Sequence, residues 1–248
     1  MLKPITKAEK EFFIFIFSTI VNRMTPLDNP VWYALNGIDS HFNEGNTVAS
    51  YFPADVSPFA GLPDWREAMQ KTLYDQLPAD RSYSAMVAEP IQFSTFWETR
   101  FSTTLHQMLY NTRIPAAACN AVCRPLNPSH IPAMLTLTAI TKPGPFLKRT
   151  FEFGNYYGVF EEEKLVAMAG ERLHLTDYTE ISAVCTDPDH TGKGYAAFLV
   201  SFLADQMLKK GKKPFLHVKH DNQRAINMYQ RLGFLHRSDM YFTVFKRR

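Results

Sequence analysis

The chain is poor in cysteine and in charge of one sign. It has three cysteines among 248 residues, Cys119, Cys123 and Cys185, which is an odd number. This count argues against a disulfide framework and is typical of a protein of the reducing cytoplasm. No second Cys/His pair accompanies Cys119 and Cys123 at zinc-finger spacing, so we expect no metal. The net charge of +3 is too small to indicate a nucleic-acid partner.

A long hydrophobic run is also lacking. The apolar stretch at residues 12–21 follows several lysines and resembles a signal peptide, but no small-x-small cleavage site comes after it. It is too short to span a bilayer as a helix, so we expect a buried helix over residues 8–24 and no membrane partner. Hydrophobic residues make up 46% of the chain, enough for a sizeable core.

The first half gives a weak pattern without repeats. Residues 25–63 indicate long loops, and we expect a helix over 64–77, a strand over 82–93 and a second helix over 95–112. A change of composition near residues 114–119 suggests a boundary. It divides the chain into an N-terminal domain, 1–115, and a C-terminal domain, 116–248.

The second half alternates clearly between helices and strands. Helices are expected over 129–140, with Ser129 as a possible cap, shortly after Pro145, and over 195–210 and 221–232. Strands are expected over 121–124, 156–161, 164–173, 178–186, 214–219, 234–237 and 240–246. This order predicts an α+β fold with one mixed sheet.

The segment from Val184 to Ala197 carries the chemistry. A strand ends there, and a polar loop with Gly192 and Gly194 opens a helix. Such a loop aims backbone N–H groups at one point, where the helix dipole adds partial positive charge, so it suits a pyrophosphate. Glycine permits the close approach and the unusual backbone angles.

Two other phosphate-binding motifs fit this loop less well. A Walker loop requires Ser or Thr after its lysine, but Gly194 follows Lys193. The dinucleotide fingerprint is satisfied formally by Gly192, Gly194 and Ala197, but its glycines should follow the strand directly. Too few residues remain for the rest of a doubly wound domain.

The loop resembles the acetyl-CoA loop of the GNAT acetyltransferases, which reads Gln/Arg-x-x-Gly-x-Gly/Ala. Thr191 stands here in place of Gln or Arg. A second match runs from Asn222 through Tyr229 to Gly233 and Phe234, and residues 180–188 are similar to the FR47-like branch. The resemblance covers residues 118–246. It implies a mixed, mostly antiparallel sheet flanked by helices, with an N-terminal α/β half that is a degenerate copy of this fold or a capping domain.

The resemblance also implies a role for each matched residue. Acetyl-CoA, as co-substrate, would be bound by the strand, the loop and the late helix, through Val184, Cys185, Thr186, Thr191, Gly192, Lys193, Gly194, Tyr195, Ala196, Ala197, Asn222 and Tyr229. The hydroxyl of Tyr229 would assist departure of the thiolate, although a tyrosine there also suits a core position. Glu180 is the expected general base, with Glu171 and His174 as rivals.

These residues indicate an enzyme that moves an acetyl group to a primary amine of a small molecule, an amino acid or a peptide. The alternative is a non-catalytic acyl-CoA-binding regulatory module. The oligomeric state stays open, with a homodimer as one option. Aromatics on the N-terminal loops either line the acceptor pocket or pack their own core: Trp32, Tyr33, Phe42, Tyr51, Phe52 and Phe59.

Overall fold

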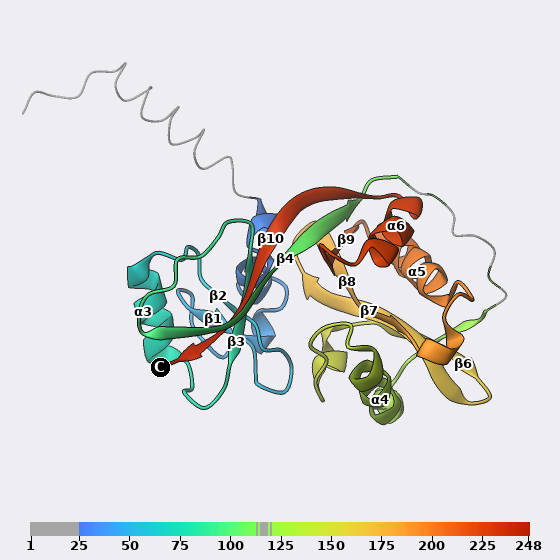
Figure 1. The fold of residues 1–248 in the computed structure, drawn as a ribbon, viewed down its shortest axis with the longest axis horizontal. Helices are drawn as coiled ribbons and strands as arrows, with labels where there is room; N and C mark the ends of the chain where they lie inside the picture. Colours follow the sequence, from blue (N-terminus) through green and yellow to red (C-terminus); the bar gives the residue numbers. More distant parts are fainter. Residues whose placement is uncertain (1–24, 113, 115–118, 120) are drawn as a thin grey trace, which may run out of the picture.

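A computed structural model describes residues 25–112, 114, 119 and 121–248 (Figure 1). The expected helix over residues 8–24 lies outside this part. One eight-stranded sheet runs through the molecule in the order β3-β10-β4-β9-β8-β7-β6-β5, and β1 and β2 form a separate pair. All neighbours in the large sheet are antiparallel except β8 and β9, which are parallel. The expected α+β class with a mostly antiparallel sheet is confirmed.

The strands have the following bounds: β1 Ser50–Tyr51, β2 Ala60–Gly61, β3 Tyr83–Val87, β4 Trp97–Tyr110, β5 Cys123–Pro125, β6 Tyr156–Glu161, β7 Lys164–His174, β8 Tyr178–Thr186, β9 Lys213–Lys219 and β10 Phe234–Arg247. The α-helices are α2 Pro30–Leu35, α3 Glu67–Gln76, α4 Ile131–Thr141, α5 Tyr195–Lys209 and α6 Gln223–Arg231. Short 3₁₀ turns are η1 Pro26–Asp28, η2 Ser40–Phe42, η3 Pro128–His130, η4 Thr150–Phe153 and η5 Pro188–His190.

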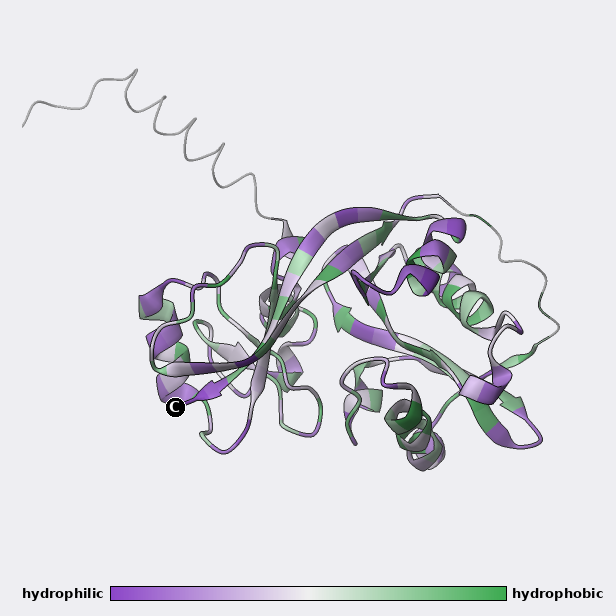
Figure 2. Cartoon of the chain, in the orientation of Figure 1, coloured by the Kyte–Doolittle hydropathy of each residue, from purple (hydrophilic) through white to green (hydrophobic). Residues whose placement is uncertain are grey.

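Helices cover both faces of the large sheet. On one face α5 and α6 pack against β7, β9 and β10, and Leu199, Leu203 and Met207 are buried there. On the other face the first half of the chain packs Leu27 and Leu35 against Phe215 of β9. The helix α4 lies on that second face, beside β7 and β8 (Figure 1). Figure 2 shows that α4 and α5 are largely hydrophobic, which agrees with their place against the sheet.

The strand β4 corrects the expected helix over residues 95–112. It lies inside the sheet, paired with β10 over its whole length and with β9 over Leu105–Leu109. Met108 is buried against the α5 and α6 core, whereas Leu105 and Leu109 pack against the first half on the other face. Over Leu105–Leu109 the strand is therefore packed on both faces and loses the alternation of apolar and polar residues, so this part of the pattern does not distinguish it from a helix.

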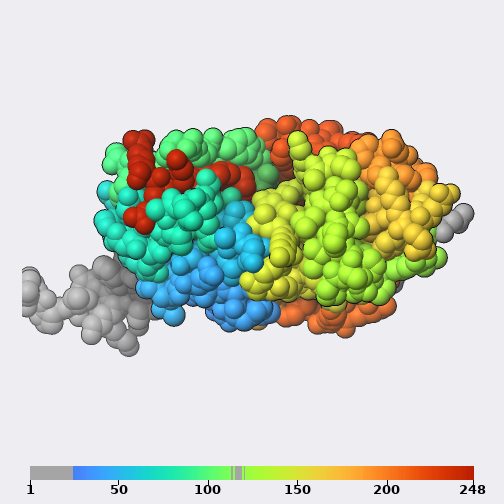
Figure 3. All heavy atoms as spheres, turned by 90° about the horizontal axis from the view of Figure 1, so that it is seen from below, coloured from blue at the N-terminus to red at the C-terminus, as the bar shows by residue number. Residues whose placement is uncertain are grey.

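The position of β4 joins the two halves of the chain. The boundary expected near residue 115 falls in the connection from β4 to β5, and residues on both sides of it form one sheet. In Figure 3 the C-terminal residues lie among residues of the first half. The end of the chain therefore completes the packing of its beginning.

Two smaller corrections concern the N-cap of one helical segment and an expected break between two strands. The side chain of Asn127, not Ser129, accepts the capping hydrogen bond at the start of the η3–α4 segment. The two final strands expected over 234–237 and 240–246 are one strand, β10, with a bulge at Arg237. No helix in the described ranges is both long and apolar enough to cross a membrane.

Candidate functional site

The parallel strands β8 and β9 separate halfway along their length. They pair only from Tyr178 to Glu180, although β8 continues to Thr186 and β9 to Lys219. Past the pairing, β8 contains a bulge at which Ala183 adopts φ 53°. A residue with a side chain rarely takes this left-handed conformation, and such strain is common beside functional sites. The divergence leaves backbone groups of both strands available to a ligand.

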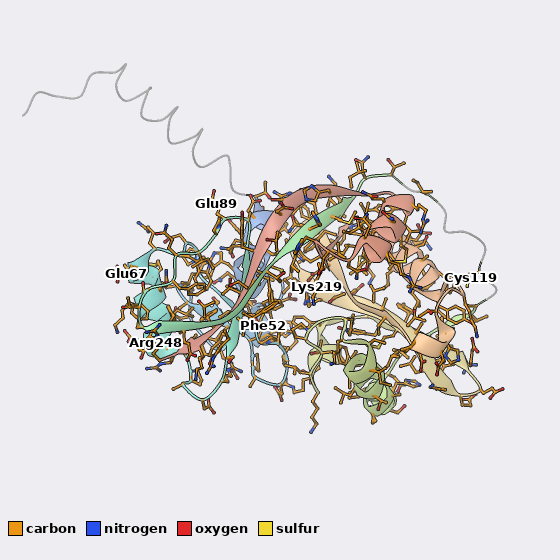
Figure 4. The ribbon with its side chains drawn as sticks, in the orientation of Figure 1. Phe52, Glu67, Glu89, Cys119, Lys219 and Arg248 are labelled. Atoms are coloured by element: carbon orange, nitrogen blue, oxygen red, sulfur yellow. The ribbon has the colours of Figure 1, made fainter. Side chains whose placement is uncertain are left out.

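A cavity of about 850 Å³ occupies the space between the diverging strands. Its walls come from β8, the loop before α5, the end of β9 and α6. Lys219, labelled in Figure 4, marks the β9 side of this cavity near the centre of the molecule. The volume lies in the range of small-molecule and cofactor sites, roughly 300–1,000 Å³.

The glycine loop forms one end of the cavity. Gly192 and Gly194 both have φ 84°, and a Cβ on either would meet no atom within 4 Å. Their conformation, rather than crowding, therefore requires glycine. Gly194 is also the N-cap of α5, so the first free N–H groups of that helix lie at this end of the cavity. The Thr191 hydroxyl donates to the carbonyl of Pro188 at 3.2 Å and stabilises the turn.

Most of the residues expected to bind the cofactor line this one cavity. They are Val184, Cys185, Thr186, Thr191, Gly192, Gly194, Tyr195, Ala196, Ala197, Asn222 and Tyr229. Lys193 does not; its ammonium group binds Glu161 of β6 at 2.8 Å. The Tyr195 hydroxyl donates a short hydrogen bond to the same carboxylate. Glu161 therefore holds these two side chains, while Tyr195 also contributes to the wall.

Tyr229 and Cys185 both line the cavity. Tyr229 is 6% exposed, and burial raises the pKa of its hydroxyl, with the nearby Cys185 adding to the effect. Burial likewise raises the pKa of the Cys185 thiol to about 11, so it is a neutral wall residue and a weak nucleophile. Asn222 caps α6, since its side-chain oxygen accepts from the Ala225 N–H at 3.1 Å.

Glu180 lies behind the wall of the cavity. It is fully buried, and Arg172 of β7 donates to both of its carboxylate oxygens. Burial alone would raise the pKa of Glu180, but the charge of Arg172 and hydrogen bonds from Arg172 and His217 outweigh it and lower the pKa to about 2. Arg172 and His217 line the cavity, whereas Glu180 does not.

Sequence reasoning missed the residues that complete this buried network. The side-chain nitrogen of Gln107 in β4 donates to the carbonyl of Leu27 at 2.8 Å, and its oxygen accepts from Arg237 at 2.8 Å. The amide orientation is thereby fixed, so the contact of 3.0 Å between Gln107 Nε2 and His217 Nε2 requires the histidine nitrogen to accept. His217 must then carry its proton on Nδ1, where it donates to Glu180 at 2.7 Å. This hydrogen-bond network becomes visible only from contacts between side chains of different strands.

The rival bases lie elsewhere. Glu171 accepts from the backbone and side chain of Asn155, at 3.0 and 2.8 Å, and His174 binds Asp39 of the first half at 2.9 Å. Neither belongs to the cavity lining. The two side chains lie 3.7 Å apart, and His174 connects β7 to the first half of the chain through Asp39.

The far end of the cavity has a different character from the glycine loop. Its apolar surface comes from the first half of the chain and from β10, through Phe59, Met86, Phe101, Leu105 and Phe242. Of the loop aromatics singled out in the sequence, Phe59 lines the cavity, and the guanidinium of Arg172 lies 5.1 Å from its ring centre. Phe42, Tyr51 and Phe52 are buried in the cores of the first half.

Charge is unevenly distributed around the cavity. Lys142, Arg172, Lys219, Arg224 and Arg231 contribute to its lining. Among the described residues, no aspartate or glutamate does. The cavity therefore suits an anionic ligand and offers no carboxylate to a cationic one.

Comparisons with known proteins agree with this geometry. The family model described as FR47-like protein matches residues 156–243. A GNAT-family protein of known structure from Novosphingobium aromaticivorans is 31% identical over 91% of this chain and 100% of its own, with a TM-score of 0.83. A comparison with curated protein sequences finds no significant match.

Two more distant structures share the fold. A GCN5-related N-acetyltransferase from Kribbella flavida, 15% identical, covers 86% of this chain and 93% of its own with a TM-score of 0.62. A Drosophila protein, 10% identical, covers 98% and 97% with a TM-score of 0.59. The sheet, the splayed strands, the glycine loop and the full-length match to the Novosphingobium protein lead to one conclusion: the chain belongs to the GNAT acetyltransferase family.

Proposed function

We propose that this protein transfers an acetyl group from acetyl-CoA to the primary amine of a small molecule, an amino acid or a peptide. The observation that carries the proposal is the cavity between β8 and β9, which brings the glycine loop and Tyr229 to a single ligand-sized space. The three cysteines, all free, favour a cytoplasmic location.

The lining fits the anionic part of acetyl-CoA. The N–H groups of residues 192–197 would hold the pyrophosphate, supported by the N-terminal dipole of α5. Arg224, Arg231 and Lys142 are available for further phosphate charge. The strand segment Val184–Thr186 would bind the pantetheine arm through its backbone. Bound acetyl-CoA supplies the activated acetyl group.

Tyr229 is the proposed acid of the reaction. Its pKa is raised by burial, so the hydroxyl keeps its proton at neutral pH and is available as a hydrogen-bond donor. A thiolate leaving group near Tyr229 can be stabilised by a hydrogen bond from this hydroxyl.

Glu180 is proposed to support the site through its neighbours. It was expected to be the general base, but its carboxylate is paired with Arg172 and His217 and lies outside the cavity lining. With a pKa of about 2 it is a weak base. Its position instead suits the orientation of His217 and the neutralisation of Arg172 beside the acceptor end.

This arrangement restricts the acceptor. Neutralising a lysine-like amine at pH 7 costs about 4–5 kcal/mol, whereas an α-amino group with a pKa near 8 costs only about 1 kcal/mol. His217 has both ring nitrogens in hydrogen bonds, and no carboxylate faces the cavity among the described residues. An amine of low pKa with an apolar body fits the end formed by Phe59, Phe101 and Phe242, better than a polyamine or a lysine side chain does. We assign the shaping of this end to the N-terminal half, residues 1–115, and to β10.

Ligand-induced stabilisation and turnover test the proposal. At a hundred times Kd a ligand adds about 2.7 kcal/mol of stability, which should raise Tm by roughly 5–10 °C with acetyl-CoA. NAD is the control and should give no shift. Release of CoA should depend on an added amine, and apolar amino acids or short peptides should exceed polyamines. Stabilisation by NAD alone would contradict the cofactor; acetyl-CoA binding without turnover on any amine would favour a regulatory module.

A further inference from the structure

Three side chains converge where β10 is bulged. Asp239 pairs with His106 of β4, and His236 pairs with Met108. Between these two pairs β10 has one residue more than β4, namely Arg237. Successive side chains of a strand alternate between its faces, so His236 and Asp239 would point to opposite sides of a regular strand. The extra residue brings both to the face of His106.

The three side chains form a compact donor set. His236 Nε2 lies 2.9 Å from Asp239 Oδ1, and His106 Nδ1 lies 3.1 Å from the same oxygen. One ligand atom from each residue lies within 4.8 Å of the other two. Zinc binds histidine nitrogen and carboxylate oxygen at roughly 2.0–2.2 Å, which places the ligand atoms of a tetrahedral ion about 3.4 Å apart. The two short separations are a few tenths of an ångström smaller, so small side-chain rotations would open the set around one ion.

His106 has an unused nitrogen inside this set. Its Nδ1 atom is buried, and among the described residues it makes no hydrogen bond of regular geometry, although Oδ1 of Asp239 lies 3.1 Å away. Buried polar atoms in proteins normally have a partner. A ligand placed between His106 and Asp239 would supply one.

The bulge itself is held firmly from the other face. The Arg237 side chain points away from the histidines and donates to Gln107 at 2.8 Å and to Asp28 at 2.7 Å. These bonds fix the backbone on which His236 and Asp239 stand. Metal sites require such outer support to keep their ligands in place.

We propose that His106, His236 and Asp239 bind a divalent transition-metal ion of the zinc type, with water completing its coordination. Two imidazole nitrogens and one carboxylate suit zinc and its neighbours, whereas magnesium and calcium prefer oxygen ligands alone. On binding, the proton on Nε2 of His236 passes to Nδ1 through solvent, and the hydrogen bond to Asp239 is replaced by one bond from Nε2 and one from the carboxylate to the ion. The ion would fasten β4 to β10. None of the three residues lines the cavity, so this site is independent of the transfer reaction.

Titration of the chelator-treated protein with Zn²⁺ tests the site. Calorimetry should show one saturable equivalent, and the ion should raise Tm, whereas Mg²⁺ should do neither. His106→Ala and His236→Ala should each weaken Zn²⁺ binding at least about tenfold. Asp239→Asn, which keeps the shape of the side chain and removes its charge, should weaken binding as well.

The matched control is His41→Ala, which removes an exposed histidine of η2 outside the set. It should bind Zn²⁺ as the unaltered protein does. Failure of the unaltered protein to bind Zn²⁺ would overturn the proposal. Unchanged affinity in both histidine variants would overturn it too, since the ion would then be bound elsewhere.

Discussion

The Nδ1 atom of His217 lies 2.7 Å from Oε1 of Glu180, and the Glu180 carboxylate also accepts both hydrogen bonds of the Arg172 fork. A single carboxylate thus balances a buried cation and fixes the tautomer of a histidine on the cavity wall. Glu180 therefore has a structural role in the site: it holds Arg172 and His217 in place.

Glu180→Gln should therefore destabilise the protein by about 3–5 kcal/mol, because it leaves Arg172 buried without its counter-charge. Glu180→Gln should also lower activity, and the fold-loss should be the same at every pH. Urea unfolding and a pH–rate profile measure the two effects. The double variant Arg172→Met/Glu180→Leu, which removes both charges, should regain stability but not activity. A loss confined to neutral pH, with recovery toward the pKa of the amine, would instead identify Glu180 as the general base.

Tyr229→Phe should reduce kcat by about 10²-fold or less and leave the KM for acetyl-CoA nearly unchanged. The ring and its packing against Phe234 stay in place, and only the hydroxyl is lost. The control is Tyr157→Phe, which removes a hydroxyl from a tyrosine of the same core that does not line the cavity. Equal kcat values for the two variants would show that Tyr229 is a core residue.

Gly194→Ala and Gly211→Ala form a matched pair at the two ends of α5. Both glycines have positive φ, 84° and 73°, and a Cβ on either meets open space. Each substitution should destabilise the protein by about 1–2 kcal/mol through the backbone alone. Only Gly194→Ala should abolish the Tm shift produced by acetyl-CoA, because Gly211 is remote from the cavity lining. Loss of the shift in both variants would point to a general effect on folding.

Phe101→Ala should raise the KM for the acceptor amine several-fold and leave acetyl-CoA binding unaltered. Phe101 lines the far end of the cavity and is 50% exposed, so its removal should change stability little. Leu235→Ala removes a side chain of similar exposure, 54%, outside the cavity. If both variants kept the amine kinetics of the unaltered protein, the acceptor would have to bind away from β4.

Stability should depend on pH through the contact between β7 and the first half. Burial would lower the pKa of His174, but Asp39 and Glu171 raise it to about 9. A pKa above the unfolded value of about 6.5 favours folding fully below pH 6.5, and that contribution, up to about 3 kcal/mol, is lost as pH rises through 9. Unfolding in urea across this range should show the decline.

Glu171 adds a second limit at low pH. Burial would raise its pKa, but His174, Asn155 and Lys210 lower it to about 2, so its contribution is present above pH 4.5 and is lost as pH falls toward 2. His174→Asn should remove the decline between pH 6.5 and 9. His41→Asn, at an exposed site, should keep it. A decline that survives in His174→Asn would have to arise from another group.

Several elements of the second half could be predicted closely from the sequence. The helix expected over 195–210 is α5, Tyr195–Lys209, and the strands expected over 156–161 and 178–186 have those bounds in the structure. Their periodicity is regular, and Gly194 and Gly211 mark both ends of α5. The loop could be predicted as well, because its glycines are adjacent in the sequence to the strand and the helix that position them.

Contacts between distant strands could not be predicted in this way. Gln107 and His217 meet because β4 and β9 are neighbours, and the register of two strands is not encoded in either strand alone. The same holds for His106, His236 and Asp239, which a bulge brings to one face. Packing on both faces over Leu105–Leu109 also concealed the strand β4, and with it the connection between the two halves.

The insertion of β4 between β9 and β10 has a consequence for biosynthesis. During translation β4 emerges early, yet both of its neighbours in the sheet come from the last part of the described chain. Its N–H and C=O groups remain without their final partners until then, and a chaperone or a temporary fold must shield them. The many contacts between residues distant in sequence also predict slow folding. We therefore expect the nascent chain to acquire its native core after the ribosome has released β10, and not domain by domain.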